Sequence, residues 1–185
     1  MVNMLLSYNQ LKKLVADGVI LNVTDELING TSIDVTLGSK ILVEKFGLAV
    51  GIVSLKDKQP LNMQEFDMGT DGFYILNPGE FILAGTEQIF HLPLNISAEY
   101  KLKSSMARIG LEHLNAGWCD PGWNGSVLTL ELINCSRYHS IRITPGERIG
   151  QVVFFNNALV PATVSYQKRG RYNGDSQVCR PKPDP

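Results

Sequence analysis

Cysteine and histidine are scarce in this chain, with three of each among 185 residues. Cys119, Cys135 and Cys179 are odd in number and lie far apart in the sequence. A disulfide framework and a CxxC metal site are therefore not expected. We interpret the three cysteines as reduced thiols that mostly pack in the interior.

Positive charge is not in surplus, and long apolar runs are missing. Seventeen Lys and Arg stand against eighteen Asp and Glu, a balance that gives no support for binding to nucleic acid or an anionic membrane surface. No segment offers about eighteen uninterrupted apolar residues, and the opening MVNMLLSYNQLKK has neither a basic leader nor a long apolar core. We expect a cytoplasmic protein without nucleic-acid or membrane partners.

The length and composition suit one domain over 1–185, because 44% of the residues are hydrophobic and can form a substantial core. The polar segment 56–72 has mixed charge and ends in glycines, and we interpret it as an excursion over the surface. The tail, about 167–185, carries Lys and Arg among Gly and Pro. We expect this tail to be mobile and locally basic.

The N-terminal pattern predicts a short helix followed by strands. Ser7 and Gln10 have the spacing of a capping box, and Gly18 is placed to end the helix. Alternating apolar and polar residues over 33–43 then predict a strand, a turn at Gly38 and Ser39, and a second strand.

Two later segments, 74–83 and 141–149, repeat one design in which an apolar run is followed by Pro-Gly-Glu. Pro fixes the first φ of a type II turn and Gly supplies the positive second φ, so two hairpin-like corners are expected. Short strands with turn signals about every ten residues favour a mainly β fold, an antiparallel sandwich or barrel of jelly-roll type.

Groups that bind anions and move protons gather between residues 103 and 134. Ser104 and Ser105 are donors, while Lys103 and Arg108 bring positive charge into the same short turn-forming segment. Such a set suits the oxygens of a polyphosphate, although the P-loop pattern is absent. In the structural alternative, the serines cap a helix and the two cations are solvated.

Glu131 is a lone carboxylate in an otherwise apolar strand. Strand alternation places it on the same face as Thr129, and both faces of the strand are largely apolar. The carboxylate should be at least partly buried, where an unpaired charge costs several kcal/mol. Two interpretations stay open: a carboxyl group with a raised pKa that shuttles protons, and a buried pair with Arg108, Arg142 or Arg148.

The segment Asp120-Pro121-Gly122-Trp123 joins a carboxylate to a turn and an aromatic ring. In a functional interpretation, Asp120 accepts a hydrogen bond from a sugar hydroxyl or a water, and the ring lines a pocket for a base. In a structural interpretation, the segment is an ordinary turn with Trp123 packed beneath it.

Four blocks, KSSMAR, AGWCDPGWNG, LTLELIN and TPGERIGQVVFF, resemble in order and spacing the deoxycytidine triphosphate (dCTP) deaminase branch of the dUTPase superfamily. The likeness extends to INGTSIDVTLG, LNPGEF and a Tyr in the tail, and so spans nearly the whole chain. It implies a distorted jelly-roll β-barrel of the dUTPase-like type and a homotrimer with active sites between subunits. It also implies metal-independent hydrolysis of dCTP to dUTP and ammonia, with Mg²⁺ bound only through the triphosphate and with dUTP or dTTP as product or inhibitor.

The resemblance also assigns roles by position. Glu131 falls on the glutamate that activates water for attack at C4 of cytosine, and Ser104 and Arg108 fall on the other two catalytic positions. The matching substrate-binding positions are Lys103, Ser105, Met106 and Ala107 on the triphosphate turn, Ala116 beside the water, Asp120 at the 3'-hydroxyl, Thr129 and Leu130 at the base, and Gln151, Tyr166, Arg171 and Asp175 at further nucleotide contacts.

Some positions depart from the family pattern and leave alternatives open. Asn115 stands where Thr is common, and Asp175 stands where a phosphate-binding Gln is expected, with Gln177 nearby as a substitute. The pair Gly117-Trp118 resembles bifunctional members, so an enzyme that also cleaves the triphosphate to release dUMP and pyrophosphate stays open. The remaining alternatives are a monofunctional dUTPase and an inactive nucleotide-binding regulator.

Zinc is not expected at the catalytic centre. Zinc deaminases hold their metal with an H-x-E and a P-C-x-x-C pattern. The histidines His91, His113 and His139 and the three isolated cysteines form neither pattern.

Overall fold

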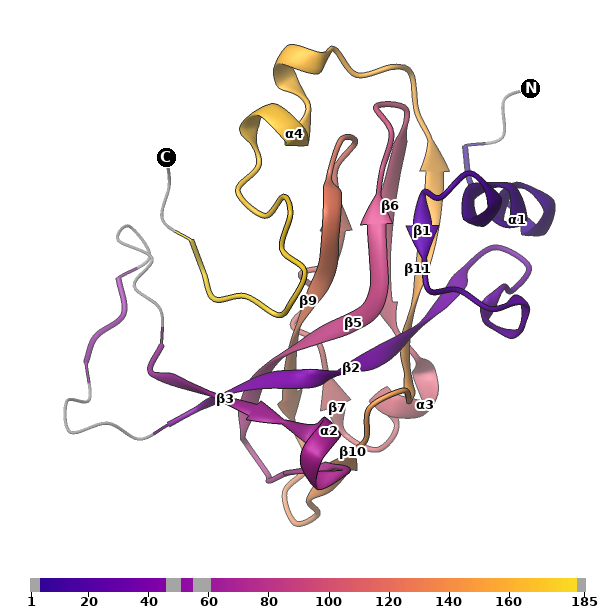
Figure 1. Ribbon diagram of the computed structural model, residues 1–185. Helices are drawn as coiled ribbons and strands as arrows, with labels where there is room; N and C mark the ends of the chain where they lie inside the picture. Colours follow the sequence, from indigo (N-terminus) through magenta and orange to yellow (C-terminus); the bar gives the residue numbers. More distant parts are fainter. Residues whose placement is uncertain (1–3, 46–50, 55–60, 183–185) are drawn as a thin grey trace.

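A computed structural model of the protein describes residues 4–45, 51–54 and 61–182. Strands dominate its regular structure and curl into a half-open barrel (Figure 1). In chain order the elements are α1 (Tyr8–Ala16), β1 (Ile20–Leu21), η1 (Asp25–Leu27), β2 (Ile33–Glu44), β3 (Met63–Asp67), α2 (Met68–Asp71), β4 (Tyr74–Leu76), β5 (Phe81–His91), β6 (Ile96–Leu102), α3 (Ser104–Ala107), β7 (Leu111–Glu112), β8 (Trp118–Cys119), β9 (Asn124–Asn134), β10 (Ile141–Ile143), β11 (Arg148–Asn156), η2 (Ala162–Val164) and α4 (Tyr166–Arg169).

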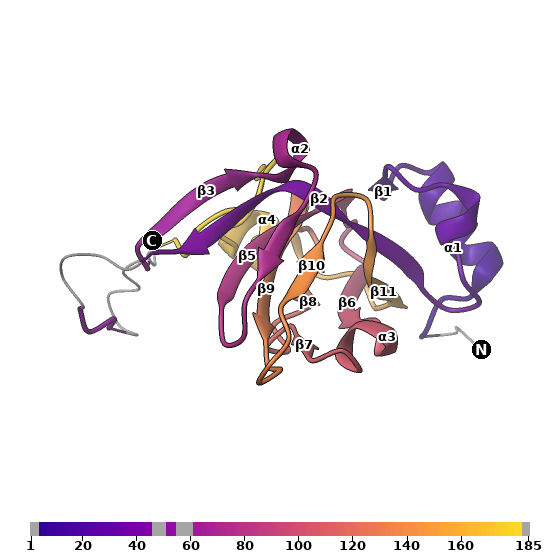
Figure 2. The same ribbon diagram turned by 90° about the horizontal axis from the view of Figure 1, so that it is seen from below.

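The main sheet has nine strands in the order β7-β9-β5-β2-β11-β6-β8, with β1 added on β5 and β3 added on β2. Its strand pairs are antiparallel. Seen from below, the sheet is bent, with α1 at one side of the molecule and β3 at the other (Figure 2). The mainly β fold and the short N-terminal helix predicted from the sequence are confirmed.

Helix α1 begins and ends where the sequence predicts. The Ser7 amide donates to Gln10 Oε1 at 3.0 Å, which is one half of the capping box. Gly18 follows the helix with φ of +75°, a conformation that other residues rarely adopt. Leu11 and Leu14 pack into the core from this helix.

Strand β2 corrects the prediction of a turn at Gly38 and Ser39. The strand runs unbroken from Ile33 to Glu44, and its pairing register with β5 shifts between Leu37 and Ile41. A Cβ on Gly38 would lie 3.0 Å from the carbonyl oxygen of Gly85. The glycine therefore permits the close approach of β5 at a bulge and does not mark a reversal of the chain.

The expected surface excursion over 56–72 is wrong where the structure describes it. Residues 63–67 form β3 on the edge of β2, and 68–71 form α2, whose Met68 is fully buried. Residues 56–60 of that prediction lie outside the described residues. Strand β3 is short, mostly exposed and without alternating burial, which explains why its sequence did not predict a strand.

The two Pro-Gly turns form the predicted corners, but each joins strands of different sheets and not the two strands of a hairpin. Gly79 and Gly146 have φ of +77° and +80°, as type II turns require. However, β4 pairs with β10 in a separate two-stranded sheet, and each turn leads the chain into a strand of the main sheet. Glu80 and Glu147 close the turns by accepting backbone N–H groups three residues earlier, at 2.8 and 3.1 Å.

Tyr100 on β6 is the largest fully buried side chain of the core. Its ring lies against Gly150, where an added Cβ would come within 2.0 Å of ring atoms. Its hydroxyl has no hydrogen-bond partner among the described residues. A buried hydroxyl without a partner costs about 1–3 kcal/mol of folding free energy.

We therefore predict that Tyr100→Phe keeps the packing and raises the free energy of unfolding by about 1 kcal/mol. The matched control is Tyr74→Phe, since the Tyr74 hydroxyl does bond to Glu80, and this variant should lose about 1 kcal/mol. Urea denaturation of both variants measures whether each free energy of unfolding rises or falls relative to wild type. An equal loss in both would contradict the prediction.

Candidate active site

Strand β9 carries Glu131 as its alternation predicts. Leu130 and Leu132 are buried in the core, while Glu131 and Thr129 face the other way and are half-buried. Leu83 on β5 lies opposite Glu131 in the pairing register, and residues opposite each other share one face of a sheet. Burial raises the pKa of Glu131 above its ordinary value, partly offset by a backbone hydrogen bond.

The buried ion pair proposed as an alternative is not formed. Glu131 has no hydrogen bond or salt bridge to Arg108, Arg142 or Arg148 within the described part of the chain. Arg148 Nη1 lies 3.6 Å from Asp34 instead, and the Arg142 guanidinium lies over the ring of Phe73 at 5.8 Å. Among the described residues, the Glu131 carboxyl therefore has no ion-pair partner, and it faces a cavity that Arg180 also lines.

This cavity, of about 420 Å³, is formed between β9, β8 and the C-terminal segment. Its volume lies in the usual range for small-molecule sites. It brings together six of the residues predicted from the sequence, namely Ala116, Asp120, Thr129, Glu131, Tyr166 and Asp175. It also contains Trp118 and three side chains that the sequence reasoning missed as site residues, namely Tyr172, Cys179 and Arg180. Because these come from an edge strand and the tail, only the pairing of distant segments could have identified them.

The Asp120 turn combines both interpretations made from the sequence. Trp123 is buried and stacks on Phe90 at 5.2 Å between ring centroids, as the structural interpretation expects. Asp120 is exposed at the rim of the cavity. Its Oδ1 accepts a hydrogen bond at 3.0 Å from Nε1 of Trp118, which orients the carboxylate and leaves its second oxygen for a ligand.

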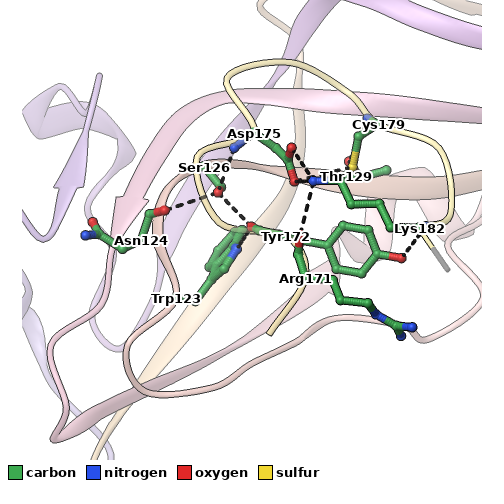
Figure 3. Close-up of polar contacts among 9 residues, drawn as sticks. All are labelled: Trp123, Asn124, Ser126, Thr129, Arg171, Tyr172, Asp175, Cys179 and Lys182. Atoms are coloured by element: carbon green, nitrogen blue, oxygen red, sulfur yellow. Dashed lines mark hydrogen bonds and ion pairs between the residues drawn. The ribbon is translucent and has the colours of Figure 1, made fainter. Parts of the chain in front are cut away.

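The C-terminal segment lies along β9, where Figure 3 shows its contacts. The Tyr172 carbonyl accepts from Trp123 Nε1 at 2.7 Å and from Ser126 Oγ at 2.8 Å. The Val127 amide donates to the Asp175 carbonyl at 2.9 Å. The tail therefore covers one end of the cavity in this conformation, and its mobility stays a prediction.

Within this segment, the Asp175 carboxylate already forms an ion pair. Lys182 Nζ lies 2.6 and 2.7 Å from its two carboxylate oxygens and 5.4 Å from the centroid of the Tyr172 ring. The Cys179 amide donates to Thr129 Oγ1 at 3.3 Å. These contacts fold residues 171–182 back on themselves and hold Cys179 at Thr129, the residue next to Glu131 on that face of β9.

The predicted triphosphate turn lies elsewhere, in and around α3. Ser104, Ser105, Ala107 and Arg108 are exposed and Met106 is partly buried against the core. None of them lines the cavity of Glu131. Figure 1 shows α4 at the top of the molecule and α3 at the lower right. One chain therefore does not bring Ser104 and Arg108 to Glu131.

Asp34 anchors this turn, and the sequence reasoning missed it. Its side chain is 2% exposed and accepts from Lys103 Nζ at 2.8 Å and from Asn29 Nδ2 at 2.9 Å. Gln151 lies opposite Asp34 in the β2–β11 pairing, and its Oε1 accepts from Ser32 Oγ at 3.1 Å. Lys103 and Gln151 thus lie in one polar cluster around a buried carboxylate.

Arg171 lines a second cavity, also of about 420 Å³, with Arg169. This cavity shares Asp120, Tyr166 and Tyr172 with the first. Burial raises the pKa of the Tyr166 hydroxyl. The two cavities therefore meet at Asp120. The first contains Glu131 and Arg180, and the second contains the guanidinium groups of Arg169 and Arg171.

In the described ranges, no group of three or more His, Cys, Asp or Glu side chains is arranged to hold a metal ion. The helices in those ranges are also all too short or too polar to cross a membrane.

The chain is similar to known proteins in sequence and in fold. The profile of the dCTP deaminase-like family matches residues 5–157. A protein named "dCTP deaminase, dUMP-forming" from Sulfurihydrogenibium sp. is 32% identical over 173 residues, 92% of each chain. One of the same name from Coprothermobacter proteolyticus is 34% identical over 177 residues, 92% of this chain and 91% of that protein.

Among solved structures, the 2'-deoxycytidine 5'-triphosphate deaminase of Agrobacterium tumefaciens superposes with a TM-score of 0.67 at 19% sequence identity. The match covers 88% of this chain and 51% of that one, so this chain spans about half of its length. At this identity, the likeness establishes the fold alone.

The raised pKa of Glu131 predicts a pH-dependent stability. The folded state holds the Glu131 proton more tightly than the unfolded state, whose ordinary value is 4.5. The stability that this group contributes is therefore complete below that value and is lost as pH rises through the folded pKa. Gln cannot ionise, so Glu131→Gln should melt above wild type at about pH 8, and the difference should shrink towards about pH 4.

The control is Glu65→Gln, which changes an exposed glutamate on β3. Thermal melting across this pH range should show the pH-dependent gap for Glu131→Gln alone. If the melting temperatures of Glu131→Gln and wild type differed equally at both ends of the pH range, burial of the Glu131 charge would not destabilise the protein.

Proposed function

The chain belongs to the dCTP deaminase-like family, and on this basis we propose that it hydrolyses dCTP to dUMP, releasing ammonia and pyrophosphate. Two water molecules are consumed, one at C4 of cytosine and one at the triphosphate. The names of the relatives support this reaction. They favour it over the release of dUTP, which the sequence alone placed first.

The observation that carries the deamination is the half-buried carboxyl of Glu131 at the wall of a cavity. A raised pKa brings such a group closer to neutrality, where it can both accept and return a proton. Glu131 takes a proton from water as the oxygen bonds to C4. It passes this proton to the ring nitrogen N3, takes the second proton from the hydroxyl now bonded to C4 and passes it to the amino group. The C4–N bond then breaks, ammonia leaves and the C4 carbonyl forms.

We propose that the other catalytic residues come from a second copy of the chain in a homotrimer. Support comes from the separation of the two halves of the site, since Ser104 and Arg108 are exposed on α3 and do not line the Glu131 cavity. In a rotationally symmetric assembly, the α3 turn of each copy can complete the cavity of its neighbour. Arg108 would then supply an ion-pair partner, which Glu131 lacks among the described residues of its own chain.

The nucleotide contacts follow the same division. Asp120 accepts the 3'-hydroxyl, and Thr129 and the Leu130 backbone contact the base, with the Ala116 carbonyl at the water. The residues proposed to contact the phosphates are Lys103, Ser105, Met106, Ala107, Gln151, Tyr166, Arg171 and Asp175. The Asp175 carboxylate must first exchange its Lys182 partner or approach the phosphates through a cation.

Mg²⁺ enters as the companion of the triphosphate, and we propose that deamination uses no zinc. The chain is proposed to work in the cytoplasm. Elemental analysis of active protein checks the metal, and one bound zinc per subunit whose removal stops turnover would overturn this mechanism.

We predict that Glu131→Gln lowers ammonia release by about a thousandfold or more, because the amide keeps the shape but cannot accept a proton. Glu65→Gln should retain wild-type activity. Ammonia and nucleotide products are measured after incubation with dCTP and Mg²⁺. Wild-type protein should yield dUMP and pyrophosphate. Accumulation of dUTP would restrict the proposal to deamination. Ammonia release by Glu131→Gln at the wild-type rate would refute the role of this residue.

A further inference from the structure

The Asp120 carboxylate is held by one side chain among the described residues, the indole of Trp118. Nε1 of Trp118 donates to Asp120 Oδ1 at 3.0 Å. Both residues line the cavity of Glu131 and both are exposed, whereas Cys119 between them is buried. Side chains two residues apart in an extended segment lie on the same face. The backbone of this segment therefore places the indole beside the carboxylate.

Strand β8 keeps the indole in place. Trp118 pairs with β6 in an antiparallel register, and its ring lies 6.2 Å from the Phe155 ring between centroids. A Cβ on Gly117 would lie 2.7 Å from the carbonyl oxygen of Tyr100, so the glycine permits the close approach of β8 to β6. The pair Gly117-Trp118 thus provides a donor on a fixed strand for the carboxylate of Asp120.

The Asp120 side chain would have other orientations without this bond. Exposed side chains change rotamer within nanoseconds. The guanidinium groups of Arg169 and Arg171 line the second cavity, which Asp120 shares, and they attract a carboxylate. The bond from Trp118 opposes both effects, because it keeps one carboxylate oxygen on the indole and leaves the other available to a hydroxyl donor.

We propose that Trp118 is a positioning residue, which holds Asp120 for the 3'-hydroxyl of the substrate and so makes the enzyme select nucleotides that carry this hydroxyl. The inference rests on the proposed function, in which Asp120 accepts the 3'-hydroxyl. A hydrogen bond to a charged acceptor favours a substrate that has the hydroxyl by about tenfold to a hundredfold. Wild type should therefore show a kcat/KM for dCTP about thirtyfold above that for 2',3'-dideoxy-CTP.

The variant Trp118→Phe keeps an aromatic ring beside Phe155 and removes the N–H donor. We expect it to lower the ratio of kcat/KM for dCTP over 2',3'-dideoxy-CTP about fivefold. The value for the dideoxy nucleotide should change little, because this nucleotide has no 3'-hydroxyl to place. Ammonia release from each nucleotide in the presence of Mg²⁺ gives both values, and thermal melting checks that the variant is folded.

The matched control is Trp123→Phe, which removes the other indole N–H of the chain. This N–H donates to the Tyr172 carbonyl at 2.7 Å (Figure 3), and Ser126 Oγ still bonds to that carbonyl in the variant. The change affects the hold on the tail and not the Asp120 carboxylate. The values of kcat/KM for the two nucleotides should therefore shift by the same factor, and their ratio should stay at the wild-type value.

A double-mutant cycle tests whether Trp118 acts through Asp120. Asp120→Ala should bring the ratio for the two nucleotides close to one. Adding Trp118→Phe to Asp120→Ala should leave the ratio there, because the indole then has no carboxylate to place. If Asp120→Ala has no measurable turnover, the comparison of Trp118→Phe with Trp123→Phe decides alone.

A loss of kcat/KM by the same factor for both nucleotides in Trp118→Phe would overturn this inference, since the ring would then serve folding or assembly. An unchanged ratio would overturn it as well. Equal turnover of both nucleotides by wild type would overturn it together with the contact of Asp120 to the 3'-hydroxyl. These results would leave deamination at Glu131 intact, whereas failure of wild type to release ammonia from dCTP would overturn the proposed function itself.

Discussion

Glu131 loses much of its contact with water on β9 and gains no cation among the described residues, and the rest of the site depends on this imbalance. The apolar neighbours that cause it are needed for the core, since Leu130 and Leu132 pack inward from the same strand. Removing the charge from water raises the pKa of the carboxyl group. The fold thus places a carboxyl group with a raised pKa at a cavity wall. Residues of the tail between 172 and 181 line the same cavity.

The opposite solution is found at Asp34, which is more deeply buried but fully paired. Lys103, Asn29 and Arg148 surround its carboxylate, so Lys103 of the predicted triphosphate turn is held near β2 and β11. Within the described residues, the Asp34 carboxylate therefore has ion-pair and hydrogen-bond partners, whereas the half-buried Glu131 carboxyl has no ion-pair partner. Such a division is expected of a site that is completed by a ligand or a second copy, because a fully paired Glu131 could not exchange protons freely.

The sequence could predict what depends on local rules. Alternation placed Glu131 on the half-buried face, and Pro-Gly geometry predicted the positive φ of Gly79 and Gly146, both of which the structure shows. It could not predict contacts between distant segments. Gly38 looked like a turn because its partner Gly85 is far along the chain, and the role of Asp34 depends on Lys103, which the fold brings from the segment between β6 and α3. The tail residues at the cavity were missed for the same reason.

We propose that one copy supplies Glu131 and a neighbouring copy supplies Arg108 to each site. The most direct test mixes two inactive variants, Arg108→Ala and Glu131→Gln, after dissociating and reassembling the subunits. If sites are shared between copies of a trimer, a one-to-one mixture should regain about one quarter of the wild-type activity, because about one quarter of the sites combine both intact residues. If the mixture stays as inactive as either variant alone, although exchange of subunits is complete, both residues act within one chain and the account is contradicted.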